Sequence, residues 1–182
     1  MNNPKKPAVF LDRDGVVNKL VERDGGFYSP RSVEDFEMFP YVSESIRQLS
    51  AAGFLIIIVT NQPDISRGHM TDLALQSMHT SLLNACQIDA IYVCPHDASD
   101  ICTCRKPLPG MLFTAASDLN IDLKSSWIIG DRESDIQAGA AAGVNAIFIT
   151  DGQDAGLRDF PKTITPMYAA TLKDATHILT KM

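Results

Sequence analysis

Three aspartates and a lysine are the residues of this chain whose types and positions could carry out chemistry together. Asp12 and Asp14 lie two residues apart directly after the apolar run PAVFL, and Asp131 follows the apolar run WIIG. Converging carboxylates repel one another unless a cation is present, and a cluster of oxygen ligands suits Mg²⁺. Mg²⁺ and a basic side chain such as Lys106 would neutralise phosphoryl oxygens while a carboxylate attacks the phosphorus. The sequence therefore predicts magnesium-dependent phosphoryl transfer.

A second set of residues has the spacing of a metal site. The segment CPHDASDICTCRKP contains the ligand pattern C-x-H-x5-C-x-C, formed by Cys94, His96, Cys102 and Cys104. Three thiolates and an imidazole complete a tetrahedral Zn²⁺ site with no open position for water, which predicts a structural role for the metal. The zinc would order the loop of residues 94–106 and hold Arg105 and Lys106 at the pocket. Free or oxidised cysteines are the alternative interpretation.

Short apolar runs alternate with segments of helical spacing along the chain. The runs predict buried strands at residues 7–11, 54–60, 88–94, 125–130 and 145–150. The segments between them predict helices at residues 42–53, 71–86, 109–120 and 134–143. This alternation predicts a doubly wound α/β fold with one mostly parallel sheet. Ligands bind outside the carboxyl ends of the strands in such folds, and Asp12, Thr60 and Asp131 all stand there.

The whole chain, residues 1–182, is predicted to form one domain without a cap domain. The stretch from Asp12 to Thr60 is used up by a flap, a helix and a strand, and the stretch from Thr60 to Lys106 by a helix, a strand and the zinc loop. The flap, at about residues 18–32, carries RDGG, which is typical of a surface hairpin. The pocket is therefore expected to be open to solvent.

The C-terminal part of the chain and the remaining histidines have no such motifs. Residues 151–174 are expected to be rich in loops, and THILT at 176–180 is expected to form an edge strand. His69, His79 and His177 have no partner at ligand spacing. We expect surface or capping positions for these histidines.

Composition and charge exclude several classes of protein. The chain has 182 residues, of which 45% are hydrophobic and 21% charged, as in an ordinary globular protein. Its formal net charge of −6 gives no field that would attract nucleic acid or anionic lipid. The apolar runs AVFL and FLIIIV are too short for a signal core or a membrane span. We therefore expect a cytoplasmic monomer that acts on a small molecule and binds neither nucleic acid nor a membrane.

Four segments of the chain, FLDRDGVVN, IIIVTNQ, CRKP and IIGDRESD, resemble in this order the four motifs of the haloacid dehalogenase (HAD) superfamily of phosphohydrolases. The resemblance extends from about residue 8 to 150. Within the superfamily, DRDG together with the zinc-type loop and CRKP is similar to one branch. That branch contains the histidinol-phosphate phosphatases and the D-glycero-D-manno-heptose 1,7-bisphosphate 7-phosphatases.

The resemblance implies roles for the acidic residues. Asp12 would be the nucleophile and would form an aspartyl-phosphate. Asp14 would protonate the leaving alkoxide and then take a proton from the water that hydrolyses the intermediate. Mg²⁺ would be held by the side chains of Asp12 and Asp131 and by the main-chain carbonyl of Asp14. Asp135 would orient Lys106 or the metal shell rather than ligate the metal directly.

The resemblance also implies which side chains contact the substrate. Thr60 and Asn61 would hydrogen-bond the transferring phosphoryl group, and Lys106 would supply its counter-charge. The substrate-binding set comprises Asn18, Asn61, Gln62, Arg67, Arg105 and Lys106. Arg67 could instead be an arginine that only stabilises its loop. Arg105 could hold a second phosphate or sugar hydroxyls with the planar fork of its guanidinium.

The expected substrate is a sugar phosphate, with the heptose 1,7-bisphosphate as the preferred candidate. TNQPDISRG and CRKPLPGM look more like the heptose branch than the histidinol branch. Histidinol phosphate or another small metabolite is the alternative substrate, and a catalytically inactive, zinc-stabilised binding module is the alternative of a different class. The longer flap and NQPD, in place of the more familiar NQSG, depart from the pattern where the far end of the substrate is expected.

Overall fold

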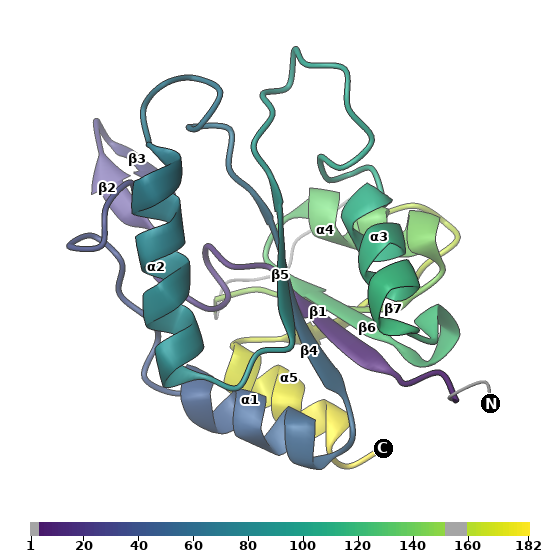
Figure 1. Ribbon diagram of the computed structural model, residues 1–182. Helices are drawn as coiled ribbons and strands as arrows, with labels where there is room; N and C mark the ends of the chain where they lie inside the picture. Colours follow the sequence, from purple (N-terminus) through teal and green to yellow (C-terminus); the bar gives the residue numbers. More distant parts are fainter. Residues whose placement is uncertain (1–3, 152–159) are drawn as a thin grey trace.

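The computed structural model describes residues 4–151 and 160–182, which are built around one six-stranded sheet (Figure 1). The strand order is β5-β4-β1-β6-β7-β8, and each neighbouring pair is parallel. The strands are β1 Ala8–Leu11, β4 Leu55–Asn61, β5 Ala90–Cys94, β6 Trp127–Gly130, β7 Asn145–Ile149 and β8 Met167–Ala169. The predicted α/β class with a mostly parallel sheet is confirmed.

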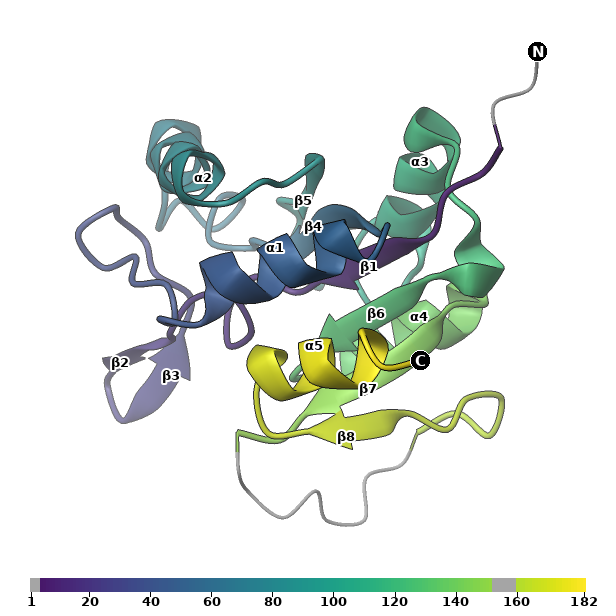
Figure 2. The same ribbon diagram turned by 90° about the horizontal axis from the view of Figure 1, so that it is seen from below.

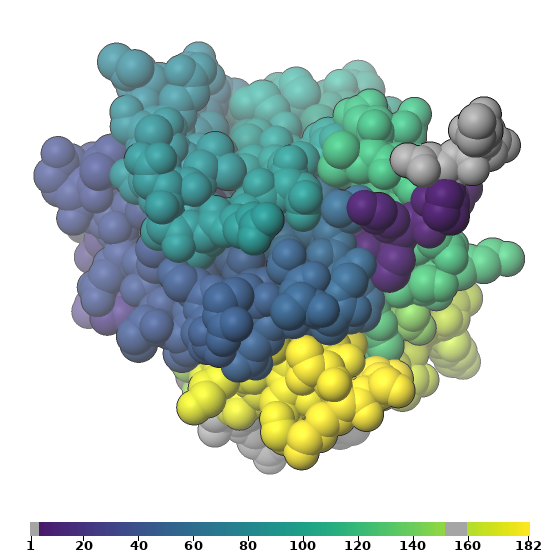
Figure 3. Space-filling model, turned by 60° about the horizontal axis from the view of Figure 1, so that its bottom comes forward, coloured from purple at the N-terminus to yellow at the C-terminus, as the bar shows by residue number. Residues whose placement is uncertain are grey.

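Helices cover both faces of the sheet (Figure 2). They are α1 Val42–Ala51, α2 Asp72–Ala85, α3 Gly110–Leu119, α4 Glu133–Ala142 and α5 Leu172–Leu179, with a short 3₁₀ turn at Leu123–Ser125. The helices α1 and α5 lie side by side on one face, where their surfaces touch (Figure 3). The helices α3 and α4 pack on the other face. In the described part of the chain, no helix is long and apolar enough to cross a membrane.

The central strand β1 explains why the predicted strands are apolar without interruption. Val9 and Leu11 point into the core formed with α1 and α5, whereas Ala8 and Phe10 point into the core formed with α3 and α4. Alternate side chains of a strand face opposite sides of the sheet, so a sheet covered on both faces needs apolar residues at every position. The acidic loop after β1 is therefore held by a fully buried strand.

A small hairpin stands apart from the sheet, within the predicted flap. It consists of β2 Val21–Arg23 and β3 Gly26–Tyr28, which pair antiparallel. Asp24 and Gly25 form its turn with φ angles of 49° and 73°, the left-handed values that favour an Asp-Gly pair in such turns. The hairpin projects beside the carboxyl ends of the central strands (Figure 1).

The predicted edge strand at residues 176–180 is wrong, because this segment belongs to α5. The Thr171 side chain accepts a hydrogen bond from the main-chain N–H of Asp174 and so begins the helix. Leu172, Ala175 and Leu179 then form a buried stripe at helical spacing. The edge strand is instead β8, within the segment of residues 151–174 that was expected to be rich in loops. The part of that prediction that covers residues 152–159 lies outside the described residues.

Candidate active site

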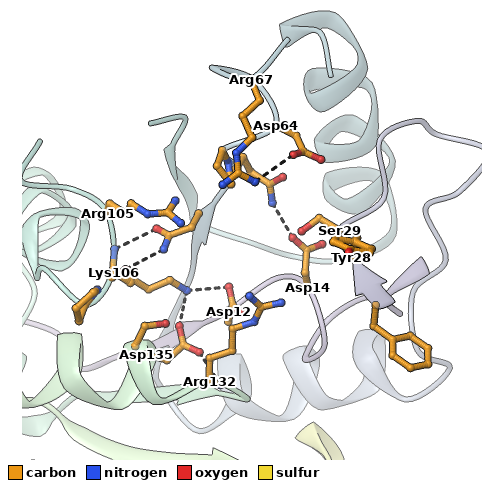
Figure 4. A pocket seen from close by; sticks show the side chains of 16 residues that line it. Asp12, Asp14, Tyr28, Ser29, Asp64, Arg67, Arg105, Lys106, Arg132 and Asp135 are labelled. Atoms are coloured by element: carbon orange, nitrogen blue, oxygen red, sulfur yellow. Dashed lines mark hydrogen bonds and ion pairs between the residues drawn. The ribbon is translucent and has the colours of Figure 1, made fainter. Parts of the chain in front are cut away.

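The predicted functional residues converge at the carboxyl ends of the central strands. Asp12 follows β1, Asn61 ends β4, and Lys106 lies on the loop between β5 and α3. A pocket of about 530 Å³ opens at this edge of the sheet (Figure 4). Acidic and basic side chains line it, together with Phe27 and Tyr28 of the hairpin and Ser29, which follows the hairpin.

Lys106 lies at the centre of a cluster that we call the floor, which consists of Asp12, Lys106, Asp131 and Asp135. Asp12, Lys106 and Asp135 line the pocket, and Asp131 offers an oxygen within 4.8 Å of those of Asp12 and Asp135. Its Nζ donates a hydrogen bond to Asp12 Oδ1 at 2.8 Å and lies 2.5 Å from Asp135 Oδ1 (Figure 4). Nζ also donates to the main-chain carbonyl of Val59 at 2.8 Å. Burial disfavours the charged amine, but the two carboxylates outweigh it and raise the pKa of Lys106. Asp135 therefore lies in direct contact with the Lys106 amine.

Three floor carboxylates lie close enough to share a cation. Asp12, Asp131 and Asp135 each offer an oxygen within 4.8 Å of the others. Burial and then the neighbouring carboxylates raise the pKa of Asp131 to about 8, and burial raises that of Asp12 to about 6 against the opposing charge of Lys106. Asp131 Oδ1 is buried without a hydrogen-bond partner. A divalent cation would offset the repulsion among the carboxylates and would give the Asp131 oxygen a partner, so these residues fit Mg²⁺.

Gly15 permits the acidic loop after β1 to approach Asp131. A Cβ at this glycine would collide with the Asp131 carboxylate, and its φ of 92° favours glycine independently. Steric contact therefore explains the glycine of the DRDG motif. Without a side chain at Gly15, the loop that carries Asp12 and Asp14 can pack against the Asp131 carboxylate after β6.

Asp14 is held by hydrogen bonds from three side chains. Arg13 donates to both of its carboxylate oxygens, Asn18 Nδ2 donates to Oδ1 at 2.9 Å, and Gln62 Nε2 donates to Oδ2 at 2.7 Å. Burial favours the protonated acid, but Arg13 and these two amides outweigh it and lower the pKa of Asp14. The carboxylate is therefore fixed in orientation and ionised in this arrangement.

Arg13 and His79 form a layer behind Asp14 that the sequence analysis missed. Arg13 is fully buried, and its guanidinium lies 5.7 Å from the centre of the Phe36 ring. Its NH1 lies 3.2 Å from His79 Nε2. Burial and the charge of Arg13 lower the pKa of His79 to about 4, which keeps the ring neutral at pH 7. His79 is thus half-buried beside the DRDG loop, and the expected surface position is wrong.

The two residues at the end of β4 have different surroundings. Thr60 is 1% exposed, and its hydroxyl accepts a hydrogen bond from Gln62 Nε2. Asn61 lines the pocket and makes two hydrogen bonds of 3.1 Å with the main chain of Lys106, one to its carbonyl and one from its N–H. The Asn61 side chain therefore fixes the backbone of the lysine whose amine reaches the floor.

Most of the predicted substrate-binding residues line the pocket. Asn61, Gln62, Arg67, Arg105 and Lys106 do so, whereas Asn18 is fully buried behind Asp14. Arg105 NH1 donates to the main-chain carbonyl of His96 at 3.0 Å. The pocket is also lined by Arg132, which the sequence analysis did not single out although it follows Asp131 directly. The pocket is therefore lined by three arginines and a buried lysine.

The cysteines and histidine of the predicted zinc loop come together away from this floor. His96 Nδ1 lies 3.5 Å from Cys94 Sγ and 3.3 Å from Cys104 Sγ, and the sulfurs of Cys94 and Cys102 are 3.9 Å apart. A tetrahedron with metal–ligand bonds of about 2.0–2.3 Å has edges of roughly 3.3–3.8 Å, close to these distances. All four cysteines of the chain are free thiols. The donor set and its spacing fit one zinc ion.

Comparison with known proteins places these features in a family. Residues 103–175 match a family model described as HAD-hydrolase-like. The D-glycero-beta-D-manno-heptose-1,7-bisphosphate 7-phosphatase of Yersinia pestis is 36% identical, with 89% of this chain and 97% of that protein covered. The protein of the same name from Vibrio cholerae is 34% identical, with 97% and 98% covered.

A solved structure has the same fold over nearly its whole length. It is the D,D-heptose 1,7-bisphosphate phosphatase of B. bronchiseptica, complexed with magnesium and phosphate. The two chains are 29% identical and superpose with a TM-score of 0.80, over 96% of this chain and 98% of the other.

Proposed function

This chain belongs to the HAD-like family of phosphatases, and we propose that it removes one phosphate from a sugar bisphosphate through an aspartyl-phosphate on Asp12. The observation that carries the proposal is the floor of the pocket. There a buried lysine holds the carboxylate of Asp12 at 2.8 Å, next to an aspartate oxygen without a partner. This combination supplies a nucleophile and the positive charge that a transferring phosphoryl group needs.

The reaction proceeds in two displacements on phosphorus. Asp14 is ionised in the free protein and takes up a proton from solvent when the anionic phosphoryl group binds beside it. A carboxylate oxygen of Asp12 then attacks the phosphorus, the bond between phosphorus and the sugar oxygen breaks, and Asp14 gives that proton to the leaving oxygen. Water then attacks the aspartyl-phosphate, Asp14 accepts a proton from it, and inorganic phosphate leaves. The donors around Asp14 favour its ionised form, which is the form the second step requires. Lys106 offsets the charge of the phosphoryl oxygens in both steps.

Two metal ions complete the proposal. Asp12 and Asp131 would hold Mg²⁺ with their side chains and Asp14 with its main-chain carbonyl, and the ion would supply positive charge to the phosphoryl oxygens. The magnesium complex of the related B. bronchiseptica phosphatase supports this choice of ion. Zinc on the four ligands of the loop would act structurally, because it leaves no open coordination position.

The mouth of the pocket favours a substrate with a second anionic group. Arg105 and Arg132 line the pocket, together with Arg67, whose charge is shared with Asp64 and Asp97. A heptose 1,7-bisphosphate, on which the named relatives act, has such a second phosphate. We take its β anomer as the preferred substrate and the 7-phosphate as the group removed. The chain would then act in the cytoplasm, as a monomer, in heptose metabolism for lipopolysaccharide.

The test is phosphate release with Mg²⁺ across a panel of substrates. The panel contains both anomers of heptose 1,7-bisphosphate, histidinol phosphate, simple sugar monophosphates and an aryl phosphate, with the Asp12→Asn variant as the blank. We expect the highest kcat/KM for the β-heptose bisphosphate. Equal, low activity on all members would keep the phosphatase chemistry and reject the proposed substrate.

A further inference from the structure

Four charged side chains form a continuous ion-pair network along one side of the pocket mouth. Arg31 Nε lies 2.6 Å from Asp64 Oδ2, Asp64 Oδ1 lies 3.7 Å from Arg67 NH1, and Arg67 NH2 lies 2.5 Å from Asp97 Oδ1. We call these four residues the rim network. Its members come from the segment after the hairpin, from the turn between β4 and α2, and from the zinc loop. The network therefore joins the three segments from which the far end of a substrate would be contacted.

Asp64 is the hub of this network. It is 8% exposed, and its two carboxylate oxygens face different arginines. Its main-chain carbonyl accepts hydrogen bonds from the N–H groups of His69 and Met70, which fixes the backbone of the turn. An aspartate that is this buried is costly unless its charge is paired, so the side chain constrains both arginines. Asp64 is also one of the two residues, with Pro63, at which NQPD departs from NQSG.

Arg67 is held between two acids from different segments. Its guanidinium faces Asp64 on the turn and Asp97 on the zinc loop, and the same side chain lines the pocket. Figure 4 shows Arg67 and Asp64 together at the mouth, on the side opposite the floor residues. The positive charge of Arg67 is already balanced by these acids. Arg67 therefore links the β4–α2 turn to the zinc loop and does not present a free positive charge to the substrate.

We propose that Asp64 is a specificity-determining positioning residue, which ties the flap, the β4–α2 turn and the zinc loop into one preorganised rim for the second anionic group of the substrate. This inference rests on the proposed sugar bisphosphate activity. A small aryl phosphate reaches only the floor, so the rim does not act on it. Preorganised contacts lower the ordering cost of binding, and their loss is therefore expected in KM for the larger substrate.

The test uses two variants and a matched control. D64N keeps the size of the side chain and one acceptor, whereas D64A removes both acceptors. E44Q is the control, because Glu44 forms an exposed ion pair with Arg47 on α1 and the change removes the same charge. Steady-state kinetics are measured for the heptose bisphosphate and an aryl phosphate. Amide hydrogen exchange is measured for residues 26–31 and 95–101.

We expect D64N to raise KM for the bisphosphate about five- to tenfold, the size of one partly exposed charge-assisted contact, and D64A to raise it further. The kcat of both substrates and KM for the aryl phosphate should stay within about twofold. Exchange should become faster in both segments, and E44Q should change none of these quantities.

Equal changes in KM for both substrates would overturn the proposal, and so would unchanged exchange in both segments. A wild-type protein that does not prefer the bisphosphate would instead reject the proposed substrate. Amide hydrogen exchange alone would then test the rim network. Faster exchange in D64N would support the role of Asp64 in linking the segments, and unchanged exchange would rule that role out.

Discussion

At the floor of the pocket, the Lys106 side chain is 2% exposed and pairs with two carboxylates, one after a strand and one at the start of a helix. At the rim, the Arg67 side chain is 43% exposed and pairs with acids on two loops. The floor charges are placed by the sheet, and desolvation strengthens their interactions. The rim charges are placed by loops and are screened by solvent. This difference suggests that the sheet fixes the chemistry and that the loops select the substrate.

Substitution of Asp12, the proposed nucleophile, is the change expected to damage the floor most. Asp12→Asn should lower kcat for every substrate by at least about 10⁴-fold, as is typical when a group that forms the covalent intermediate is lost. The fold should persist, because the amide has the same size and Lys106 keeps Asp135 as a partner. Phosphate release and thermal unfolding measure the two effects. Appreciable turnover by a folded variant would rule out Asp12 as the nucleophile.

Loss of zinc should damage the rim more than the floor. Cys102→Ser should lower the zinc content and reduce Tm by several degrees, because a structural metal contributes to folding stability. Activity on an aryl phosphate should survive in part, since Asn61 holds the Lys106 main chain independently of the metal ligands. Metal analysis, calorimetry and kinetics measure these effects. Reduced activity with unchanged zinc and unchanged Tm would contradict the structural assignment.

Truncation of Arg105, which lines the pocket outside the rim network, should separate two kinds of substrate. Arg105→Ala should raise KM for a heptose bisphosphate about tenfold, because a planar guanidinium at the mouth is lost, and should leave KM for an aryl phosphate within about twofold. Arg47→Ala, on the exposed face of α1, is the matched control. Parallel increases for both substrates would remove the recognition role of Arg105.

The pH dependence of thermal stability tests the repulsion among the floor carboxylates. Asp131 has a pKa of about 8 in the metal-free fold and an ordinary value of 3.8, so the folded state binds the extra proton and loses stability as pH rises through 8. His79 acts in the opposite sense only between pH 4 and 6.5. Metal-free protein should therefore lose a few degrees in Tm from pH 6.5 to 8.5.

Added Mg²⁺ should remove most of that loss, because the cation favours the ionised carboxylates. Thermal unfolding at both pH values, with and without Mg²⁺, measures the effect. Asp131→Asn is the control and should flatten the metal-free profile. A profile that falls equally in wild type and in Asp131→Asn would show that other groups cause it.

The floor could be predicted from the sequence, and most of the rim could not. Asp12 and Asp131 follow apolar strands directly, and parallel strands bring their ends together whatever the loops do. The four residues proposed to bind zinc lie within eleven consecutive residues, so local spacing is sufficient to find them. The rim network instead pairs Arg31 with Asp64 and Arg67 with Asp97. Such pairs of charged residues depend on how separate loops fold.

Two errors have the same physical cause. His79 reaches Arg13 across 66 residues of sequence, and no local pattern marks that contact. The segment THILT is rich in β-branched residues, yet the buried stripe that makes it helical begins upstream at Leu172. Tertiary packing overrides local preference in both places.

We propose that one phosphate is hydrolysed at the floor while arginines of the pocket bind the other. Phosphorus NMR of the product formed from β-heptose 1,7-bisphosphate tests it most directly, because the two phosphates have separate signals. We expect inorganic phosphate and a product that keeps its anomeric phosphate. A product that has lost the anomeric phosphate, or both phosphates at equal rates, would contradict it.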